Sequence, residues 1–85
     1  MAARRLDMYS DVPLYEQLAA MLRERIRTGQ LKQLDPLPSE TTLEQEFEVS
    51  RDTVRRAIQQ LRDEGLVFTV RRRGTYVGPR PSAED

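Results

Sequence analysis

The chain has 85 residues, of which 33% are charged, with 14 basic and 14 acidic side chains and neither cysteine nor histidine. This length supports one small domain. The missing residue types exclude disulfides, zinc sites built on cysteine or histidine, and nucleophile–histidine catalytic pairs, so we expect no enzyme and no cofactor. We find no apolar run near the roughly 20 residues that span a bilayer, and no signal-peptide segment. A cytoplasmic protein without a membrane partner is therefore expected.

The N-terminal part of the chain predicts an arm followed by a helix. Residues 1–11 have no sustained periodicity and are expected to form a flexible arm. Pro13 suits the first turn of a helix, and Gly29 suits its end. Apolar residues recur every four positions between them: Leu14, Leu18, Leu22 and Ile26. This spacing predicts an amphipathic helix over residues 13–28, with its arginines mostly on the solvent-exposed sides.

The middle of the chain predicts a loop and a short second helix. Residues 31–38 contain two prolines and no helical pattern, which indicates a loop with at most one short strand near Leu37. Ser39 is a plausible N-cap for a helix over residues 40–47 that buries Leu43 and Phe47. Another face of this helix carries three carboxylates: Glu40, Glu44 and Glu48. That spacing is typical of a solvated face rather than a metal site.

A third helix is predicted from the Ser50 cap to about Glu64, with Gly65 ending it. Its apolar side consists of Val54, Ala57, Ile58 and Leu61. An adjoining side carries Arg51, Arg55, Gln59 and Arg62, with Arg56 further round the helix. Two short helices joined by a turn of three or four residues form a helix-turn-helix unit, and here the second helix carries the arginines.

The C-terminal part predicts a β-hairpin. Residues 66–70 are rich in β-branched and apolar types, residues 71–74 form a tight basic loop, and residues 75–77 form a second strand. Residues 79–85 have the composition of a linker or tail. Four aromatic side chains are expected in the core rather than at a base-stacking surface: Tyr15, Phe47, Phe68 and Tyr76.

The zero net charge hides a segregation of charge along the chain. Residues 1–48 carry six basic and nine acidic side chains, whereas residues 49–80 carry eight arginines and three acids. A phosphate backbone meets one face of a protein, and arginine forms bidentate contacts with phosphate and guanine. The distribution therefore favours a nucleic-acid partner for the second half of the chain.

Several linked motifs resemble the N-terminal domain of GntR-family bacterial transcription regulators. They are Leu37-Pro38-Ser39-Glu40, Val49-Ser50-Arg51-Asp52-Thr53-Val54-Arg55, Glu64-Gly65-Leu66-Val67 and Arg73-Gly74-Thr75-Tyr76-Val77. The segment Pro13-Leu14-Tyr15-Glu16-Gln17-Leu18 looks most like the HutC branch. The resemblance implies a mainly α fold with a small antiparallel β-hairpin, a winged helix-turn-helix over residues 12–78.

The resemblance also implies sequence-specific binding of double-stranded DNA by a regulator, most commonly a repressor. By this resemblance, the residues that contact DNA from the start of the recognition helix are Ser50, Arg51, Thr53 and Arg55. Those that contact DNA from the wing are Arg71, Arg72, Arg73, Gly74 and Thr75. We add Ser39 and Arg56 to the predicted DNA-binding residues. Arg51 and Arg55 are predicted to contact guanine, and the other arginines to contact phosphate. Surface solvation or pairing with Asp52 or Gln59 is the alternative for Arg51 and Arg55.

Three positions depart from the family pattern. Gln33-Leu34 stands where the family usually has Pro-Gly, Glu48 where a glycine commonly makes the turn, and Arg72 where the wing has its first glycine. Glu48 is therefore expected to need a left-handed backbone. Family members normally continue into a larger C-terminal domain that binds a small molecule and dimerises. The linker-like residues after Val77 favour a domain separated from a longer protein over a natural stand-alone one.

The partners expected from this interpretation are an inverted-repeat operator, a second copy on DNA, and an effector only where a C-terminal domain is present. Nucleoid association in the cytoplasm would follow. An alternative interpretation is a winged-helix module that docks another protein through the acidic face of its second helix. Poor salt-dependent binding to any duplex would favour that alternative.

Overall fold

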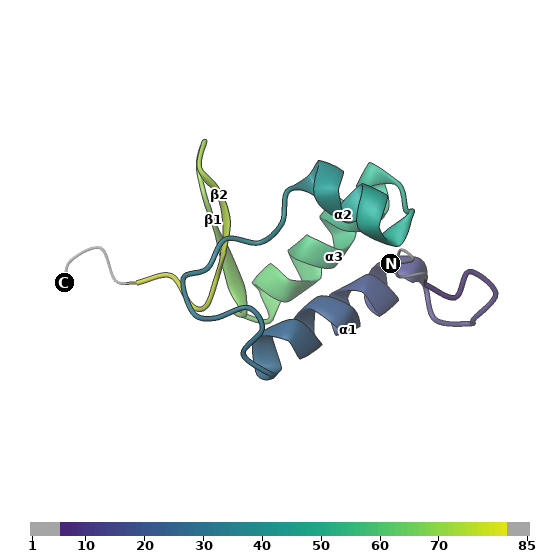
Figure 1. Ribbon diagram of the computed structural model, residues 1–85, viewed down its shortest axis with the longest axis horizontal. Coiled ribbons are helices and arrows are strands. Elements are labelled where there is room, and N and C mark those ends of the chain that lie inside the picture. The colour runs from purple at the N-terminus through teal and green to yellow at the C-terminus, as the bar shows by residue number, and fades with distance from the viewer. Residues whose placement is uncertain (1–5, 82–85) are drawn as a thin grey trace.

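The computed structural model describes residues 6–81, which form three helices and a two-stranded antiparallel hairpin (Figure 1). The elements in chain order are α1 (Leu14–Arg27), α2 (Glu40–Phe47), α3 (Arg51–Asp63), β1 (Val67–Val70) and β2 (Gly74–Val77). This is the predicted winged-helix architecture, and each predicted helix end lies within about one residue of its observed position. The hairpin projects at the opposite end of the molecule from the segment that precedes α1.

Local hydrogen bonds explain where the helices begin. The Ser39 side chain accepts from the backbone N–H of Thr42, and the Ser50 side chain accepts from the backbone N–H of Thr53. Each bond satisfies a donor that has no partner within the helix. Both predicted caps are confirmed. Pro13 lies one residue before α1 and accepts through its carbonyl from the N–H of Gln17.

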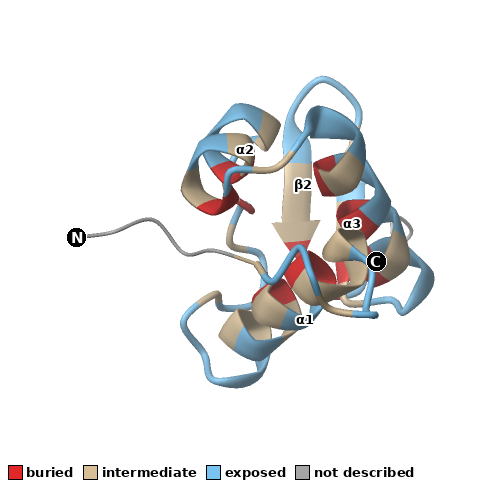
Figure 2. Cartoon of the chain, turned by 90° about the vertical axis from the view of Figure 1, so that its right-hand side faces the viewer, coloured by how far each residue is buried: buried red, intermediate tan, exposed pale blue. Residues whose placement is uncertain are grey.

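One buried cluster joins all the elements, and Figure 2 shows the buried positions on the inward sides of the helices. Its members are Leu18, Ala19, Leu22, Leu37, Leu43, Phe47, Val54, Ala57, Ile58, Leu61, Val67 and Val77. The strands contribute Val67 and Val77, which pair with each other at the base of the hairpin. The hairpin is therefore anchored in the core at its base, while its loop is exposed.

The loop between α1 and α2 runs beside β2. The N–H of Leu34 donates to the carbonyl of Val77, the N–H of Val77 donates to the carbonyl of Asp35, and the N–H of Leu37 donates to the carbonyl of Thr75, each at 2.8 Å. Pro36 and Tyr76 form a β-bridge. The short strand expected near Leu37 is thus a strand-like segment that fixes β2 from its other side.

Two sequence expectations about side-chain burial were wrong in part. Arg25 is expected from the sequence on a solvent-exposed side of α1, but its side chain is only 12% exposed and pairs with Glu46. Its Cζ atom lies 5.4 Å from the centroid of the Phe47 ring. Phe68 and Tyr76 lie outside the buried cluster as half-buried rings stacked 5.9 Å apart. Helical spacing alone did not reveal that α2 covers Arg25.

The segment before α1 is attached to the domain. Leu6 packs against the core, the Asp7 N–H donates to the Gln17 side chain, and that side chain donates back to the Asp7 carbonyl, both at 2.8 Å. The remainder of the predicted arm, residues 1–5, and residues 82–85 of the predicted tail lie outside the described residues. Within residues 6–81, no helix is both long enough and apolar enough to cross a membrane.

An ion pair ties α1 to the end of α3. Arg23 donates to both carboxylate oxygens of Glu64, at 2.9 and 2.7 Å. The hydrogen bond from Arg23 holds the pKa of the Glu64 carboxyl below its usual value, while the same bond raises the pKa of Arg23. The pair links α1 to the C-terminal end of α3 on the surface, beside the buried contacts that hold the two helices together.

The three departures from the family pattern coincide with three strained backbone positions. Among the described residues, the non-glycine residues with positive φ are Leu34 at 70°, Glu48 at 57° and Arg72 at 67°. The left-handed backbone expected at Glu48 is confirmed. A side chain with a Cβ atom pays about 1–2 kcal/mol for this conformation, which glycine avoids.

Leu34→Gly is expected to stabilise the domain by about 0.5–1 kcal/mol, because it removes a strained Cβ from a side chain that is already 52% exposed. The melting temperature should rise by about 2–8 °C. Leu34→Ala is the control, since it shortens the side chain but keeps the Cβ atom. A glycine variant that melts no higher than the alanine variant would show that backbone strain at this position does not lower the stability of the domain.

Candidate nucleic-acid interface

An open cleft separates α3 from the hairpin. Its volume is about 830 Å³, and it is bounded by the start of α2, one face of α3 and the hairpin loop. Six of the residues predicted from the sequence line it: Ser39, Arg55, Arg72, Arg73, Gly74 and Thr75. The fold therefore brings together residues that are up to 36 positions apart in the chain, on three separate elements.

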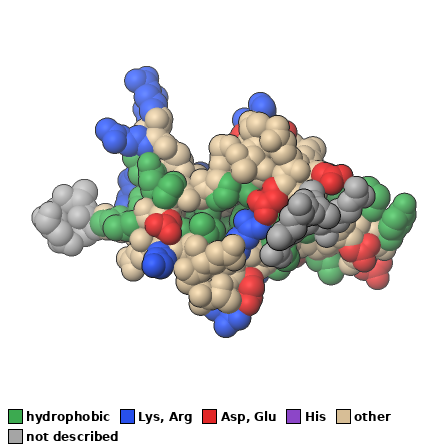
Figure 3. All heavy atoms as spheres, in the orientation of Figure 1, with side chains coloured by type: hydrophobic (Ala, Val, Ile, Leu, Met, Phe, Trp, Pro, Cys, Tyr) green, Lys and Arg blue, Asp and Glu red, His purple; other side chains and the backbone are tan. Residues whose placement is uncertain are grey.

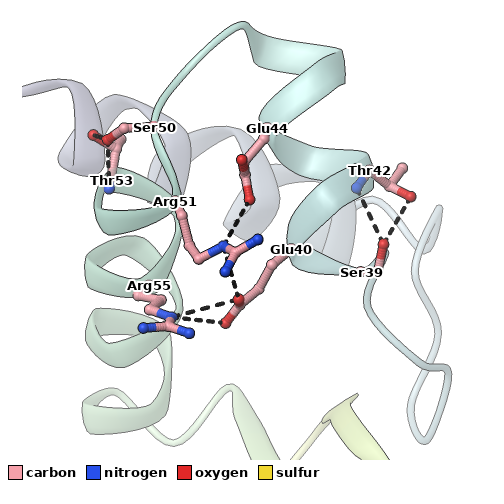
Figure 4. A network of polar contacts seen from close by, with 8 residues as sticks. All are labelled: Ser39, Glu40, Thr42, Glu44, Ser50, Arg51, Thr53 and Arg55. Carbon is pink, nitrogen blue, oxygen red and sulfur yellow. Dashed lines mark hydrogen bonds and ion pairs between the residues drawn. The ribbon is translucent and has the colours of Figure 1, made fainter.

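Two arginines of α3, Arg51 and Arg55, are paired with carboxylates of α2 (Figure 4). Arg51 donates through Nε to Glu44 at 3.3 Å, and the same Nε lies 4.0 Å from Glu40. Arg55 donates through Nε to both oxygens of Glu40, at 3.4 and 3.3 Å. Both arginine side chains remain about 60% exposed. The acidic face predicted to be merely solvated is thus directed partly at the arginine face of α3.

The two capping serines also organise neighbouring hydroxyls. The Ser50 hydroxyl lies 3.1 Å from the Thr53 hydroxyl, and the Ser39 hydroxyl lies 2.9 Å from the Thr42 hydroxyl. Ser39 lines the cleft, whereas Ser50 and Thr53 stand at the start of α3 beyond its lining. A helix start carries partial positive charge and outward N–H groups, which suits an anion such as phosphate.

The hairpin loop places consecutive arginines at its tip. Arg71, Arg72 and Arg73 are all exposed, and Figure 3 shows basic side chains at the projecting end of the hairpin. The loop is closed by the Arg73 N–H, which donates to the Val70 carbonyl at 2.9 Å, and the left-handed backbone of Arg72 lies within this turn. Arg72 and Arg73 line the cleft, while Arg71 lies outside its lining.

Arg56 points to a different part of the surface. It pairs with Asp52 on the same helix at 3.1 Å and lines a smaller hollow with Tyr15, Gln60 and Asp63. This hollow faces α1 rather than the hairpin. Arg56 is therefore separated from the arginines of the cleft, as its position further round the helix predicted.

A family comparison decides what kind of domain carries this cleft. Residues 14–77 match the family described as bacterial regulatory proteins, gntR family. The match includes all three helices and both strands. The chain belongs to the GntR family.

Individual relatives agree with the placement among GntR proteins. The mannosyl-D-glycerate transport/metabolism system repressor MngR of Escherichia coli is 48% identical over 65 residues, which are 76% of this chain and 27% of that protein. The histidine utilization repressor of Klebsiella aerogenes is 38% identical over 65 residues, with the same coverage, and supports the HutC-like assignment. This chain thus spans about a quarter of the length of these relatives.

A solved structure shares the whole GntR domain. The crystal structure of AraR(DBD) in complex with operator ORX1 aligns with a TM-score of 0.83 and 32% identity, covering 92% of this chain and 99% of that one. The three helices and hairpin described above are therefore the winged-helix architecture of GntR domains.

Three polar side chains on the helices of the GntR cleft, those of Gln59, Arg62 and Glu40, are absent from the predicted DNA-binding residues. Gln59 and Arg62 line the cleft beside Arg55, and Arg62 donates to the Thr69 hydroxyl of β1 at 2.8 Å. The signal that identifies them is helical spacing, because they share one side of α3 with Arg55. Glu40 also lines the cleft, and only the packing of α2 against α3 reveals its position.

Proposed function

We propose that this chain is the DNA-binding domain of a bacterial transcription regulator that acts as a repressor. Residues 12–78 would form the binding unit, with residues 1–11 as an arm and residues 79–85 as a linker or tail. The observation that carries the proposal is the cleft between α3 and the hairpin, with arginines on both sides. The likeness to AraR(DBD), which was crystallised in complex with an operator, supports duplex DNA as the partner.

In this proposal α3 lies in the major groove. Arg51 and Arg55 contact guanine edges, since a guanidinium can donate two hydrogen bonds to the O6 and N7 atoms of guanine. Their exposed side chains on one face of the helix support this role. The N-terminal turns of α2 and α3, with Ser39, Ser50 and Thr53, hold phosphates that fix the register of the complex.

The hairpin is the wing of the proposed complex and reaches the minor groove. Arg71, Arg72 and Arg73 carry three positive charges on an exposed turn, and a narrow minor groove attracts such charges. Gly74 and Thr75 bring the backbone of the turn close to the duplex. Arg56, which lines a smaller hollow outside the cleft, is assigned a peripheral phosphate contact.

The wider assembly is part of the same proposal. Dimers bind inverted repeats because two-fold protein symmetry matches a palindromic site, so we propose pairing of two copies on an inverted-repeat operator. The two named relatives extend well beyond the shared region, and any small-molecule effector is assigned to a domain outside residues 12–78. A regulator of this kind would work on the chromosome, in the cytoplasm.

The deciding experiment is selection of bound duplexes from a random pool, followed by salt titration on the selected duplex. Enrichment of an inverted repeat, with log K falling against log salt with a slope near −4.5 for about five phosphate contacts, supports the proposal. Binding without enrichment would leave a DNA-holding domain that lacks specificity. A chain that binds no duplex even at low salt would overturn the proposal in favour of a protein-docking module.

Arg72→Ala is expected to weaken binding to all duplexes alike and to flatten the salt slope by about one, since one phosphate contact disappears. Binding isotherms at four salt concentrations, on selected and scrambled duplexes, measure both effects. Arg72→Lys keeps the charge and should keep the slope. A loss confined to one base position would instead assign Arg72 a role in reading sequence.

A further inference from the structure

One carboxylate sits between the two arginines that the proposed function assigns to base reading. Glu40 is the first residue of α2, and its oxygens lie 3.3 Å from the Nε atom of Arg55 and 4.0 Å from the Nε atom of Arg51. Glu44 contacts Arg51 from the next turn of α2. A negative charge thus stands within a surface whose proposed partner is a polyanion.

The contact with Arg55 uses one edge of its guanidinium. Figure 4 shows Glu40 facing the Nε atom of Arg55, and both hydrogen bonds to Glu40 are donated by Nε rather than by a terminal Nη atom. A bidentate contact with guanine can be made through the terminal edge. The pairing therefore restricts a flexible side chain without using its terminal donors, which lowers the entropy lost when a base is bound.

The same carboxylate disfavours a phosphate beside Arg51 or Arg55. Glu40 lines the cleft and its side chain is 40% exposed, so its charge is only partly screened by solvent. A duplex that lacks a guanine at the right position can still attract Arg51 and Arg55 through its backbone, but doing so brings phosphate oxygens towards Glu40. Specificity arises when a wrong partner meets repulsion as well as fewer contacts.

We propose that Glu40 is a specificity-determining residue of this domain. Its carboxylate positions the Arg55 side chain, and the nearby Arg51 side chain, for contact with base edges. Its negative charge also repels backbone phosphates from the same two arginines. The inference rests on the proposed function, because it concerns the discrimination between operator and other DNA. Glu40 acts through the arginines and is a positioning residue rather than a DNA contact.

The test compares Glu40→Gln with the wild-type chain on two duplexes of equal length, the selected one and a scrambled one. The amide keeps the size of the side chain but removes its charge. We expect binding to the scrambled duplex to tighten on the order of tenfold, as removal of one nearby charge near a surface allows. Binding to the selected duplex should change less than about threefold, because lost positioning offsets relieved repulsion.

Glu24→Gln is the matched control. Glu24 pairs with Arg27 on α1, so the variant makes the same charge change and also breaks an arginine pair, but away from the cleft. It should alter both duplexes equally and leave their affinity ratio within about twofold. Glu40→Asp keeps the charge and should keep scrambled binding weak. Thermal melting of each variant ensures that binding is compared between folded proteins.

The possible results distinguish a failure of the Glu40 inference from a failure of the proposed DNA-binding function. A wild-type chain that discriminates between the duplexes, combined with an unchanged affinity ratio in Glu40→Gln, would overturn the inference alone. An equal loss of binding on both duplexes would assign Glu40 to folding or general binding and would also overturn it. A wild-type chain that binds both duplexes equally would overturn the proposed function and the inference with it.

Discussion

Arg55→Ala is expected to weaken binding to the selected duplex by about 1–3 kcal/mol, or roughly 5- to 150-fold, because a bidentate contact with guanine is lost. Arg55 lines the cleft from α3, with its side chain 62% exposed. Binding to a scrambled duplex should fall far less. Repeating the duplex selection with the variant should show a relaxed preference at a single base pair in each half-site.

Arg27→Ala is the control for this result. It removes an exposed arginine that is also paired with a glutamate, but on α1. If its effect on the selected duplex equals that of Arg55→Ala, general charge rather than base recognition governs affinity. An Arg55→Ala variant that keeps its full sequence preference would assign the reading of bases to other side chains, with Gln59 and Arg62 next in the cleft.

Phe47→Ala is expected to destabilise the domain by about 3–5 kcal/mol. Phe47 is the largest fully buried side chain, 1% exposed, at the end of α2. Its loss leaves a cavity among the helices and removes the ring beneath the Arg25 guanidinium. Because small domains unfold with about 5–15 kcal/mol in total, urea denaturation should show a large fall in the midpoint.

Phe68→Ala provides the comparison for this core substitution. Phe68 is half-buried on the hairpin, where it stacks on Tyr76 outside the buried cluster. The same truncation there should cost clearly less than at Phe47, since less apolar area leaves contact. Equal losses for the two variants would contradict the assignment of Phe47 to the centre of the core.

The elements of this fold follow from local signals in the sequence. Ser39 and Ser50 accept the hydrogen bonds expected of N-caps, and Gly29 and Gly65 adopt the positive φ values expected after helix ends. Apolar spacing identified the inward faces of the helices because burial repeats with the helical period. These signals act over a few residues, so they are readable without knowledge of the tertiary packing.

The pairing across α2 and α3 could not be predicted in the same way. Glu40 and Arg55 are 15 residues apart, and their contact depends on the angle and rotation at which the two helices pack. A helical projection treats each helix alone, so it described the carboxylates of α2 as solvated. The charge segregation along the chain also obscured this contact, because folding brings part of the acidic half beside the basic half.

Both long edges of the hairpin accept contacts from other parts of the domain, which bears on association through its strands. On one side, the residues before α2 bond to β2 through Leu34, Asp35 and Leu37. On the other, the Arg80 side chain donates to the Thr69 carbonyl of β1 at 3.1 Å and covers the Phe68 ring at 5.9 Å. An uncovered edge strand is a template for pairing with another chain. The loop before α2 removes that template from β2, and the positive charge of Arg80 lies along the edge of β1, so both edges of the projecting wing are less open to strands of another chain.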